Sequence, residues 1–128
     1  MTNKDSLSLL DRVATFSSCT RSELDLLSFI ATETLVEPGA VIIEEGTLGR
    51  EAYVIASGRA NVTCGGEIIG ALGPGEFFGE MSLLAGAPRF ATVTAETAME
   101  LMVLSPAEFQ SLLTHAPSVL RKMMRERR

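Results

Sequence analysis

The sequence predicts an α+β fold that is mainly β, in which antiparallel strands close into a sandwich or a jelly-roll β-barrel between helices at the two ends. Short apolar segments alternate with glycine turns from residue 40 to residue 104, as is typical of such architectures. Helix-capping patterns stand before and after this region. One stretch, FGEMSLLAGAPRFATV at residues 78–93, interrupts the strand pattern and marks a candidate site.

Residues 1–36 are expected to form the N-terminal helices. The four residues from Thr20 to Glu23 make a capping-box pattern, in which a hydroxyl and a carboxylate three positions apart satisfy free backbone N–H groups. Apolar residues recur before and after this cap at three- and four-residue intervals, which is helical spacing. They are Leu7, Leu10, Ala14, Leu24, Leu27, Ile30 and Ala31. Pro38 and Gly39 then end the helical pattern.

Residues 39–104 are expected to form the β-roll. Glycine-containing turns separate the strands, among them Ser57-Gly58 and Gly73-Pro74-Gly75. The predicted strands are Val41–Glu44, Ala52–Ala56, Ala60–Cys64, Ile68–Leu72, Ala91–Ala95 and Met99–Leu104.

Residues 105–128 return to helix. Ser105, Pro106 and Glu108 combine an N-cap hydroxyl, a proline at the first helical position and a glutamate at the third. Pro117 opens a second helix that runs to the basic end of the chain. With neither repeats nor a linker, the 128 residues are expected to form a single domain.

The charge distribution limits the ligands that this chain could bind. The net charge of −5 divides into +4 in the last eight residues, RKMMRERR, and −9 in the first 120. An acidic body lacks the broad basic face that nucleic acids require, so no nucleic-acid contact is expected. An anionic ligand would have to occupy one local, enclosed site.

The sequence favours a cytoplasmic location. No apolar run approaches the ~20 residues of a membrane-spanning helix, and the N-terminus has no secretion-signal pattern. Cys19 and Cys64 lie far apart without metal-type spacing, and we expect them to be reduced thiols. No direct membrane contact is expected.

The stretch 78–93 carries the chemistry. Arg89 is the only Lys or Arg between residues 60 and 120, so it needs an anionic partner. A short helix from Met81 to Ala85, following the Gly79-Glu80 turn, would leave backbone N–H groups free for a phosphate. Arg89 could hold the phosphate bidentately, while Glu80, an acceptor only, suits a sugar hydroxyl. The alternative is that Arg89 pairs with Glu80 and only stabilises a turn.

The same stretch resembles the phosphate-binding cassette of cyclic nucleotide-binding domains, whose usual form is F-G-E-x-A-L-x-x-x-x-P-R-x-A-T-V. The run GPGEFFGE at residues 73–80 is a close match to the segment that leads into the cassette. The glycine-marked hairpins upstream, at residues 45–46 and 53–59, match as well. The likeness covers nearly the whole chain, and it implies the jelly-roll form of the β-roll.

The resemblance also implies a role for individual residues. Glu80 would accept a hydrogen bond from the ribose 2′-hydroxyl, and Arg89 would pair with the cyclic phosphate. Backbone groups near Gly79, Ser82 and Phe90 would complete the cradle. The full set of expected ligand-binding residues is Phe78, Gly79, Glu80, Met81, Ser82, Arg89, Phe90 and Ala91.

Two positions depart from the usual pattern. Ser82 replaces alanine, which adds a hydroxyl and keeps the backbone donor. Phe90 stands where guanine-selective members commonly have a hydroxyl that contacts the base, so the resemblance favours cyclic AMP over cyclic GMP. Strand alternation turns Phe90 away from the face of Arg89, whereas the family places this position beside the ligand.

The last helix is expected either to pack on the barrel for stability or, as the resemblance implies, to close over the base. Its apolar face suits a base cap. The candidate cap residues are Leu120, Met123 and Met124. Movement of this helix would pass the signal to an output domain, a partner protein or a second copy in a homodimer.

The predicted function is therefore a non-catalytic regulatory domain that needs no cofactor. A cupin-type metalloenzyme is disfavoured, because the single histidine, His115, lies outside the β-region. Hydrolysis of the nucleotide is disfavoured by the lack of a metal-binding cluster. Two readings stay open: a vestigial domain that serves as a protein contact, and the sensor part of a larger transcription regulator, channel or transporter. A DNA-reading helix-turn-helix would follow the last helix, and these 128 residues leave no room for one.

Overall fold

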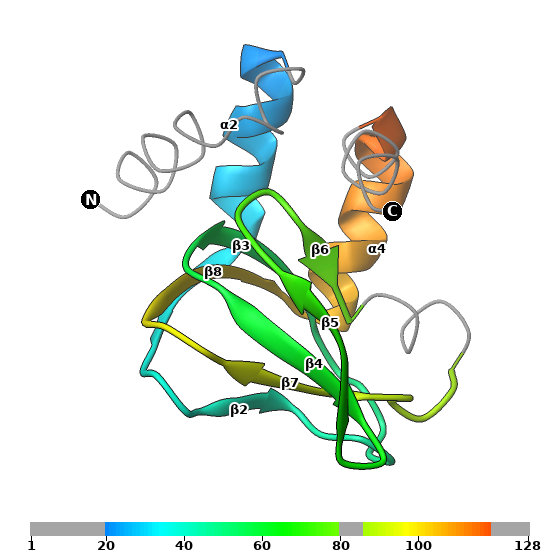
Figure 1. The fold of residues 1–128 in the computed structure, drawn as a ribbon. Coiled ribbons are helices and arrows are strands. Elements are labelled where there is room, and N and C mark those ends of the chain that lie inside the picture. Colours follow the sequence, from blue (N-terminus) through cyan, green and yellow to red (C-terminus); the bar gives the residue numbers. More distant parts are fainter. Residues whose placement is uncertain (1–19, 80–85, 119–128) are drawn as a thin grey trace.

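In the part of the chain that the structure describes, the fold is a roll of two antiparallel four-stranded sheets with two helices packed on one side (Figure 1). A computed structural model of the chain describes residues 20–79 and 86–118, including all of their side chains except those of Leu24 and Ser28. The first sheet has the order β1 (Thr32–Val36), β8 (Met99–Leu104), β3 (Ala52–Ser57), β6 (Phe77–Phe78). The second has the order β2 (Val41–Ile43), β7 (Thr92–Ala95), β4 (Ala60–Cys64), β5 (Glu67–Leu72).

The two helices, α2 (Arg21–Ile30) and α4 (Pro106–His115), begin at the predicted caps. The Thr20 hydroxyl accepts from the Glu23 N–H at 3.1 Å, and the Glu23 carboxylate accepts from the Thr20 N–H at 2.8 Å. The Ser105 and Glu108 pair repeats this arrangement at the start of α4. Both capping-box predictions are confirmed. Pro117 and Ser118 are helical, and the rest of the predicted last helix lies outside the described residues, as do residues 1–19.

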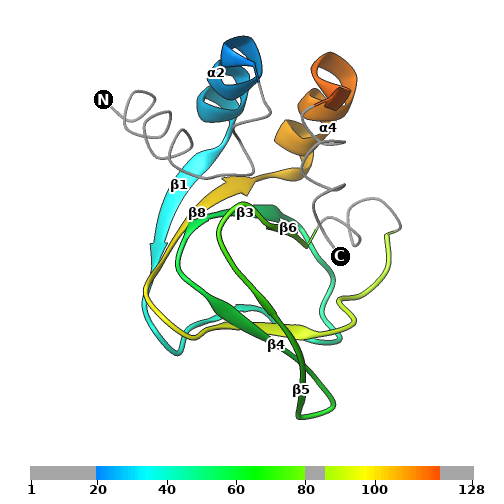
Figure 2. The same cartoon turned by 45° about the horizontal axis from the view of Figure 1, so that its top comes forward.

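Two hydrophobic clusters hold the layers together. Figure 2 shows these layers, with α2 and α4 on the outer side of the first sheet and the second sheet on its other side. One lies between the helices and the first sheet, and it includes Leu27, Phe77, Met102, Phe109 and Leu112. The other fills the roll, and it includes Tyr53, Ile55, Phe78, Val93 and Leu101. The residues of β3 alternate between the two clusters, so residues 52–56 are buried on both faces. This explains why β3 reads as a continuous apolar run.

The predicted strands are confirmed with small shifts, and two strands were not predicted. The expected N-terminal helices of residues 1–36 are wrong at their end, because Thr32–Val36 forms β1 and pairs with β8 in the register Thr32 to Val103. Its threonines and valine are β-branched and fit an extended edge strand. The other is the two-residue β6, which pairs with Tyr53 and Val54 of β3. The short helix predicted over Met81–Ala85 lies outside the described residues.

Candidate functional site

The candidate site lies between the end of β6 and the start of β7. The segment before β7 is bound to the loop after β2 by backbone hydrogen bonds. The Arg89 N–H donates to the Thr47 carbonyl at 2.7 Å, and the Arg89 carbonyl accepts from the Gly46 N–H at 2.8 Å. An antiparallel bridge between Leu48 and Pro88 adds to this contact. The main chain of Arg89 is therefore fixed before its side chain is considered.

The Arg89 side chain is buried, with 7% of its surface exposed, and it turns toward the end of β6. Its Nη1 donates to the Gly79 carbonyl at 2.6 Å, and its Nη2 donates to the Glu51 carbonyl at 2.9 Å. Both acceptors are neutral, and a guanidinium has five N–H donors. Within residues 20–79 and 86–118, no carboxylate lies within ion-pair distance of it. A buried cation in this state is costly unless an anion joins it.

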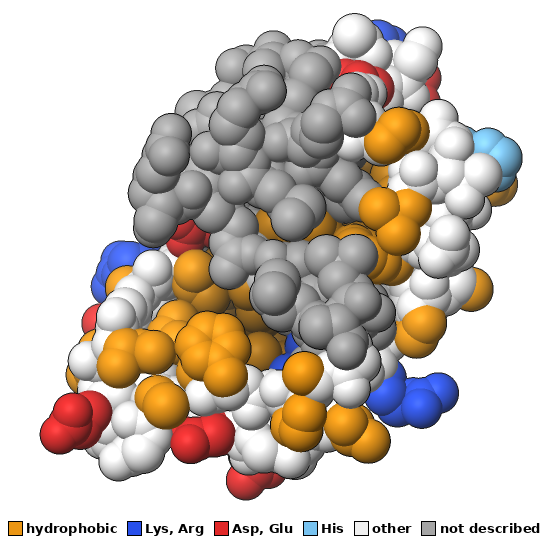
Figure 3. Space-filling view, turned by 90° about the vertical axis from the view of Figure 1, so that its right-hand side faces the viewer, with side chains coloured by type: hydrophobic (Ala, Val, Ile, Leu, Met, Phe, Trp, Pro, Cys, Tyr) orange, Lys and Arg blue, Asp and Glu red, His pale blue; other side chains and the backbone are white. Residues whose placement is uncertain are grey.

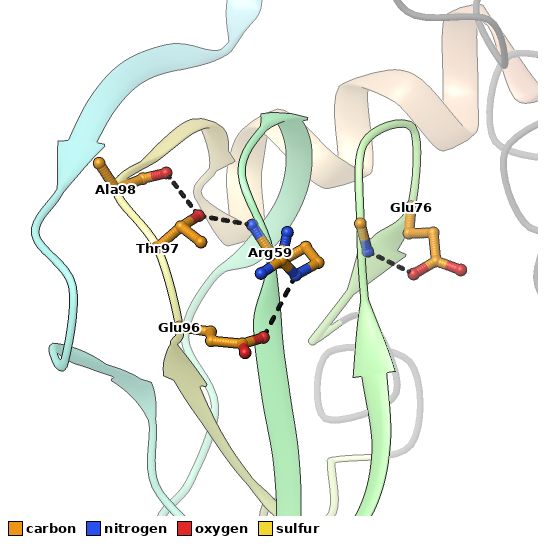
Figure 4. Close-up of polar contacts among 6 residues, drawn as sticks. Arg59, Glu76, Glu96, Thr97 and Ala98 are labelled. Atoms are coloured by element: carbon orange, nitrogen blue, oxygen red, sulfur yellow. Dashed lines mark hydrogen bonds and ion pairs between the residues drawn. The ribbon is translucent and has the colours of Figure 1, made fainter.

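Arg59 has the opposite environment (Figure 4). Its Nε lies 3.3 Å from a carboxylate oxygen of Glu96, and both side chains are largely exposed, at 59% and 44%. Backbone bonds fix the same turn, since the Arg59 carbonyl accepts from the N–H groups of Glu96 and Thr97. Arg59 therefore already has a counterion, and its guanidinium is exposed to solvent instead of lying in an enclosed site.

Position 79 requires glycine, because the backbone has a positive φ there and the Arg89 guanidinium lies against it. Its φ is +86°, in the region that favours glycine, and a β-carbon there would lie 2.9 Å from Arg89 Nη1 and 3.1 Å from the Glu51 carbonyl oxygen. A side chain at this position would displace the guanidinium. The glycine therefore serves the approach of Arg89 to the main chain as well as the turn.

Tyr53, on β3, lies at the corner formed by Glu51 and Gly79, the two residues whose carbonyls accept from Arg89. Its ring stacks on Phe78 with centroids 5.0 Å apart, and its hydroxyl donates to a carboxylate oxygen of Glu51 at 3.1 Å. Burial, with the neighbouring Glu51 carboxylate, raises the pKa of the Tyr53 hydroxyl to about 12. The hydroxyl is therefore a fixed neutral donor in the physiological range.

Phe90 and Ala91 continue the chain toward β7. Arg89 and Ala91 are buried, whereas Phe90 is 69% exposed, so burial alternates as the strand argument predicts. The Phe90 carbonyl accepts from the Cys64 thiol at 3.3 Å, which joins this segment to the end of β4. Figure 3 shows a face of the molecule on which hydrophobic side chains gather beside residues that are not described.

The structure thus brings together three of the predicted ligand-binding residues, Phe78, Gly79 and Arg89, with Phe90 and Ala91 adjoining in the chain. The remaining predicted residues lie outside the described part, and their roles stay predictions. These are Glu80, Met81, Ser82, Leu120, Met123 and Met124.

Sequence reasoning missed two residues, Glu51 and Tyr53. The Glu51 carbonyl contacts Arg89 across 38 positions of sequence, and a main-chain acceptor leaves no signal in the residue type. In the sequence, Tyr53 falls within the hairpin motif of residues 53–59 and carries no separate signal. Among the described residues, no group of three or more His, Cys, Asp and Glu side chains is placed to hold a metal ion. No helix in the same part of the chain is long and apolar enough to cross a membrane.

Comparisons with known proteins point to one family. The family model described as "Cyclic nucleotide-binding domain" matches residues 33–116. The chain is 40% identical over 106 residues to the cAMP-dependent protein kinase regulatory subunit of Yarrowia lipolytica, covering 81% of the chain and 28% of that protein. It is also 40% identical over 97 residues to a cyclic nucleotide-gated potassium channel of Rhizobium etli, covering 73% of the chain and 27% of the channel.

A solved structure gives the same picture. The catabolite activator protein of Thermus thermophilus superposes with a TM-score of 0.74 at 32% identity, over 86% of this chain and 54% of that one. The chain spans about a quarter of the length of the two curated relatives, at 28% and 27%. Each of these relatives therefore contains much more than the matched domain.

Proposed function

The chain belongs to the cyclic nucleotide-binding domain family, and from that premise we propose that it is a non-catalytic sensor whose ligand is cyclic AMP, anchored by Arg89. The two finer parts of this proposal are the mode of binding and the path of the signal. They are treated separately below, because one can fail without the other.

The observation that supports the binding mode is the buried guanidinium of Arg89, which has no carboxylate partner among the described residues. Arg89 is 7% exposed and contacts two neutral carbonyls, so three of its five N–H donors are left for a ligand within the described structure. The single negative charge of a cyclic phosphate would neutralise the guanidinium and accept two parallel hydrogen bonds from it. A neutral ligand would leave the desolvated charge uncompensated.

The sugar and the base would be read by neighbouring residues. Glu80, next to Gly79 in the chain, would accept the hydrogen bond of the ribose 2′-hydroxyl. Phe90 offers a ring instead of a hydroxyl, so it gives the guanine amino group no acceptor. Both assignments follow from the position of these residues in the family motif. They lead to a preference for cyclic AMP over cyclic GMP and over 2′-deoxy cyclic AMP.

Calorimetric titration with these three ligands tests the proposal. Cyclic AMP should bind with the highest affinity, and the 2′-deoxy compound should lose about 1.5–3 kcal/mol of binding free energy, because Glu80 would face a missing partner. Glu80→Gln should reduce this gap. If the wild-type chain binds none of the three, the domain is vestigial, and its function is contact with another protein. A clear preference for cyclic GMP would overturn the base assignment alone.

The signal would leave through the C-terminal helix. Ser118, the last described residue, donates a hydrogen bond to the Glu23 carboxylate, which links the segment after α4 to α2. In the proposed switch, the segment from Pro117 onward closes over the bound base through Leu120, Met123 and Met124, and releases when the site is empty. The names of the two curated relatives indicate a protein kinase or a potassium channel as the output that such a helix would control.

Truncation after Ala116 separates the switch from the binding site. We expect cyclic AMP to bind more weakly but not to be lost, because Gly79 and Arg89 remain. Ligand should also slow amide exchange in residues 118–126 of the full chain. Equal affinity after truncation, with protection confined to residues 79–92, would show that the helix is structural.

A further inference from the structure

The two carbonyls that hold Arg89 belong to different parts of the chain, and one side chain contacts both parts. Glu51 directly precedes β3, and Gly79 directly follows β6. These strands pair in antiparallel register, with Tyr53 opposite Phe78. The pairing of β3 with β6 beside Tyr53 therefore sets the distance between the two carbonyls. The Arg89 guanidinium donates to both of them.

Tyr53 makes a separate contact to each part. Its ring stacks on Phe78 at an interplanar angle of 14°, and its Cδ1 would lie 3.3 Å from a β-carbon at Gly79. Its hydroxyl donates to the Glu51 carboxylate at 3.1 Å. The ring therefore packs against the Gly79 side of the corner, and the hydroxyl restrains the Glu51 side.

Removing only the Tyr53 hydroxyl separates its hydrogen bond to Glu51 from the stacking of its ring on Phe78. Phenylalanine has the same ring and would keep the stack on Phe78. What it would lose is the restraint on Glu51, whose side chain is otherwise exposed to solvent and whose carbonyl accepts from Arg89 Nη2 at 2.9 Å. A bidentate contact needs the plane of the guanidinium to be fixed before the ligand arrives.

We propose that Tyr53 is a positioning residue, which orients the Arg89 guanidinium for its anion through the bond between its hydroxyl and Glu51. The inference rests on the proposed function for its ligand, but the geometry it describes exists in the free protein. It adds a residue outside the 78–93 stretch to the determinants of affinity.

Two measurements on Tyr53→Phe test this inference. In the ligand-free protein, NMR exchange spectra of the arginine side chains give the rotation rate of the Arg89 guanidinium, with Arg89→Lys used for assignment. We expect Tyr53→Phe to speed this rotation, because Glu51, whose main-chain carbonyl accepts from Nη2, loses the hydrogen bond that restrains its side chain. For cyclic AMP, we expect Kd to rise about 3- to 10-fold, since a mobile guanidinium must be ordered on binding. Glu51→Ala breaks the same bond, so the double variant should be no worse than either single variant.

Ser57→Ala is the matched control. Ser57 lies on the same strand, and its hydroxyl donates to the Glu100 carboxylate at 2.7 Å, at the end of β3 that is remote from Arg89. Removing that hydroxyl should change neither the rotation rate nor Kd. An unchanged rotation rate in Tyr53→Phe overturns the inference, as does an unchanged Kd with faster rotation. Failure of the wild type to bind any cyclic nucleotide would count against the proposed function, while the rotation rate would still decide whether Tyr53 holds Arg89.

Discussion

Arg59 and Arg89 lie at opposite ends of strand β3 and differ in almost every physical respect. Arg59 is exposed and has a carboxylate partner, Glu96, at 3.3 Å. Arg89 is buried and has only carbonyl partners among the residues described. An exposed ion pair contributes little, about 0–1 kcal/mol, whereas a buried unpaired cation is unfavourable by several kcal/mol until an anion binds. The comparison separates an arginine that completes a turn from the one that we propose binds the ligand.

The largest effect is expected from removing each arginine in turn. Arg89→Ala should weaken cyclic AMP binding by about 2–5 kcal/mol, or roughly 30- to several thousand-fold, and the protein should stay folded. Arg89→Lys should bind cyclic AMP almost as weakly, because an ammonium group does not reproduce the two parallel hydrogen bonds of a guanidinium. Arg59→Ala should leave Kd unchanged. Calorimetric titration of the three variants checks this, and equal Kd values for Arg59→Ala and Arg89→Ala would remove the distinction.

The two glycines beside these arginines should fail in different ways. Gly58 has a φ of +94°, and a β-carbon there would lie 2.4 Å from the Ala98 carbonyl oxygen and 2.8 Å from Met99 Cα, so backbone must move. Gly58→Ala should lower the free energy of unfolding by about 2–4 kcal/mol, from backbone strain and overpacking together. Denaturant titration measures this loss.

In Gly79→Ala, the closest contact of the new β-carbon would be with the end of the flexible Arg89 side chain. It should therefore cost less stability than Gly58→Ala, and more affinity for cyclic AMP. A greater loss of affinity in Gly58→Ala, measured where the protein is fully folded, would contradict the assignment of the two turns.

Strongly alkaline pH should affect the Arg89 end of β3 through Tyr53. The pKa of Tyr53 is raised from 10.0 to about 12, so the folded state keeps this proton more tightly than the unfolded state. Its contribution to stability is complete below pH 10 and is lost as pH rises through 12, by about 2 kcal/mol at pH 12. The fall in unfolding free energy between pH 10 and 12 should be smaller in Tyr53→Phe. Parallel curves for the two proteins would contradict the raised pKa.

The smallest effect concerns the base. Phe90→Thr supplies a hydroxyl at the position that favours guanine, and it should narrow the preference for cyclic AMP by about 1 kcal/mol, one hydrogen bond's net contribution. The measurement is the ratio of the two Kd values in wild type and variant. A wider preference for cyclic AMP in Phe90→Thr would show that Phe90 does not govern base choice.

Most of the fold was predictable because its signals are local. Capping boxes, glycine turns and apolar strands are each readable within a few residues, and both caps and six strands are confirmed. Strand β1 was missed, because Ala31 and Leu35 continue a helical spacing and only pairing with β8 makes the segment extended. Strand β6 has two residues and exists through its pairing with β3.

The candidate site could be identified in the sequence as a set of residue types but not as a geometry. The isolated Arg89 and its neighbouring glycine were evident in the sequence. Their contact with the Glu51 carbonyl was not, because it depends on β3 and β6 lying side by side. The same tertiary pairing places Tyr53 at the corner, so the support of the site could be found only in the folded chain.

The most direct test of the central claim is a crystal structure of the wild-type chain with cyclic AMP bound. We expect two phosphate oxygens within about 3.2 Å of Arg89 guanidinium nitrogens, a normal length for charge-assisted hydrogen bonds. Gly79 should keep its positive φ, and Arg59 should remain paired with Glu96. A bound nucleotide whose phosphate lies away from Arg89, with the guanidinium still contacting only the Gly79 and Glu51 carbonyls, would contradict it.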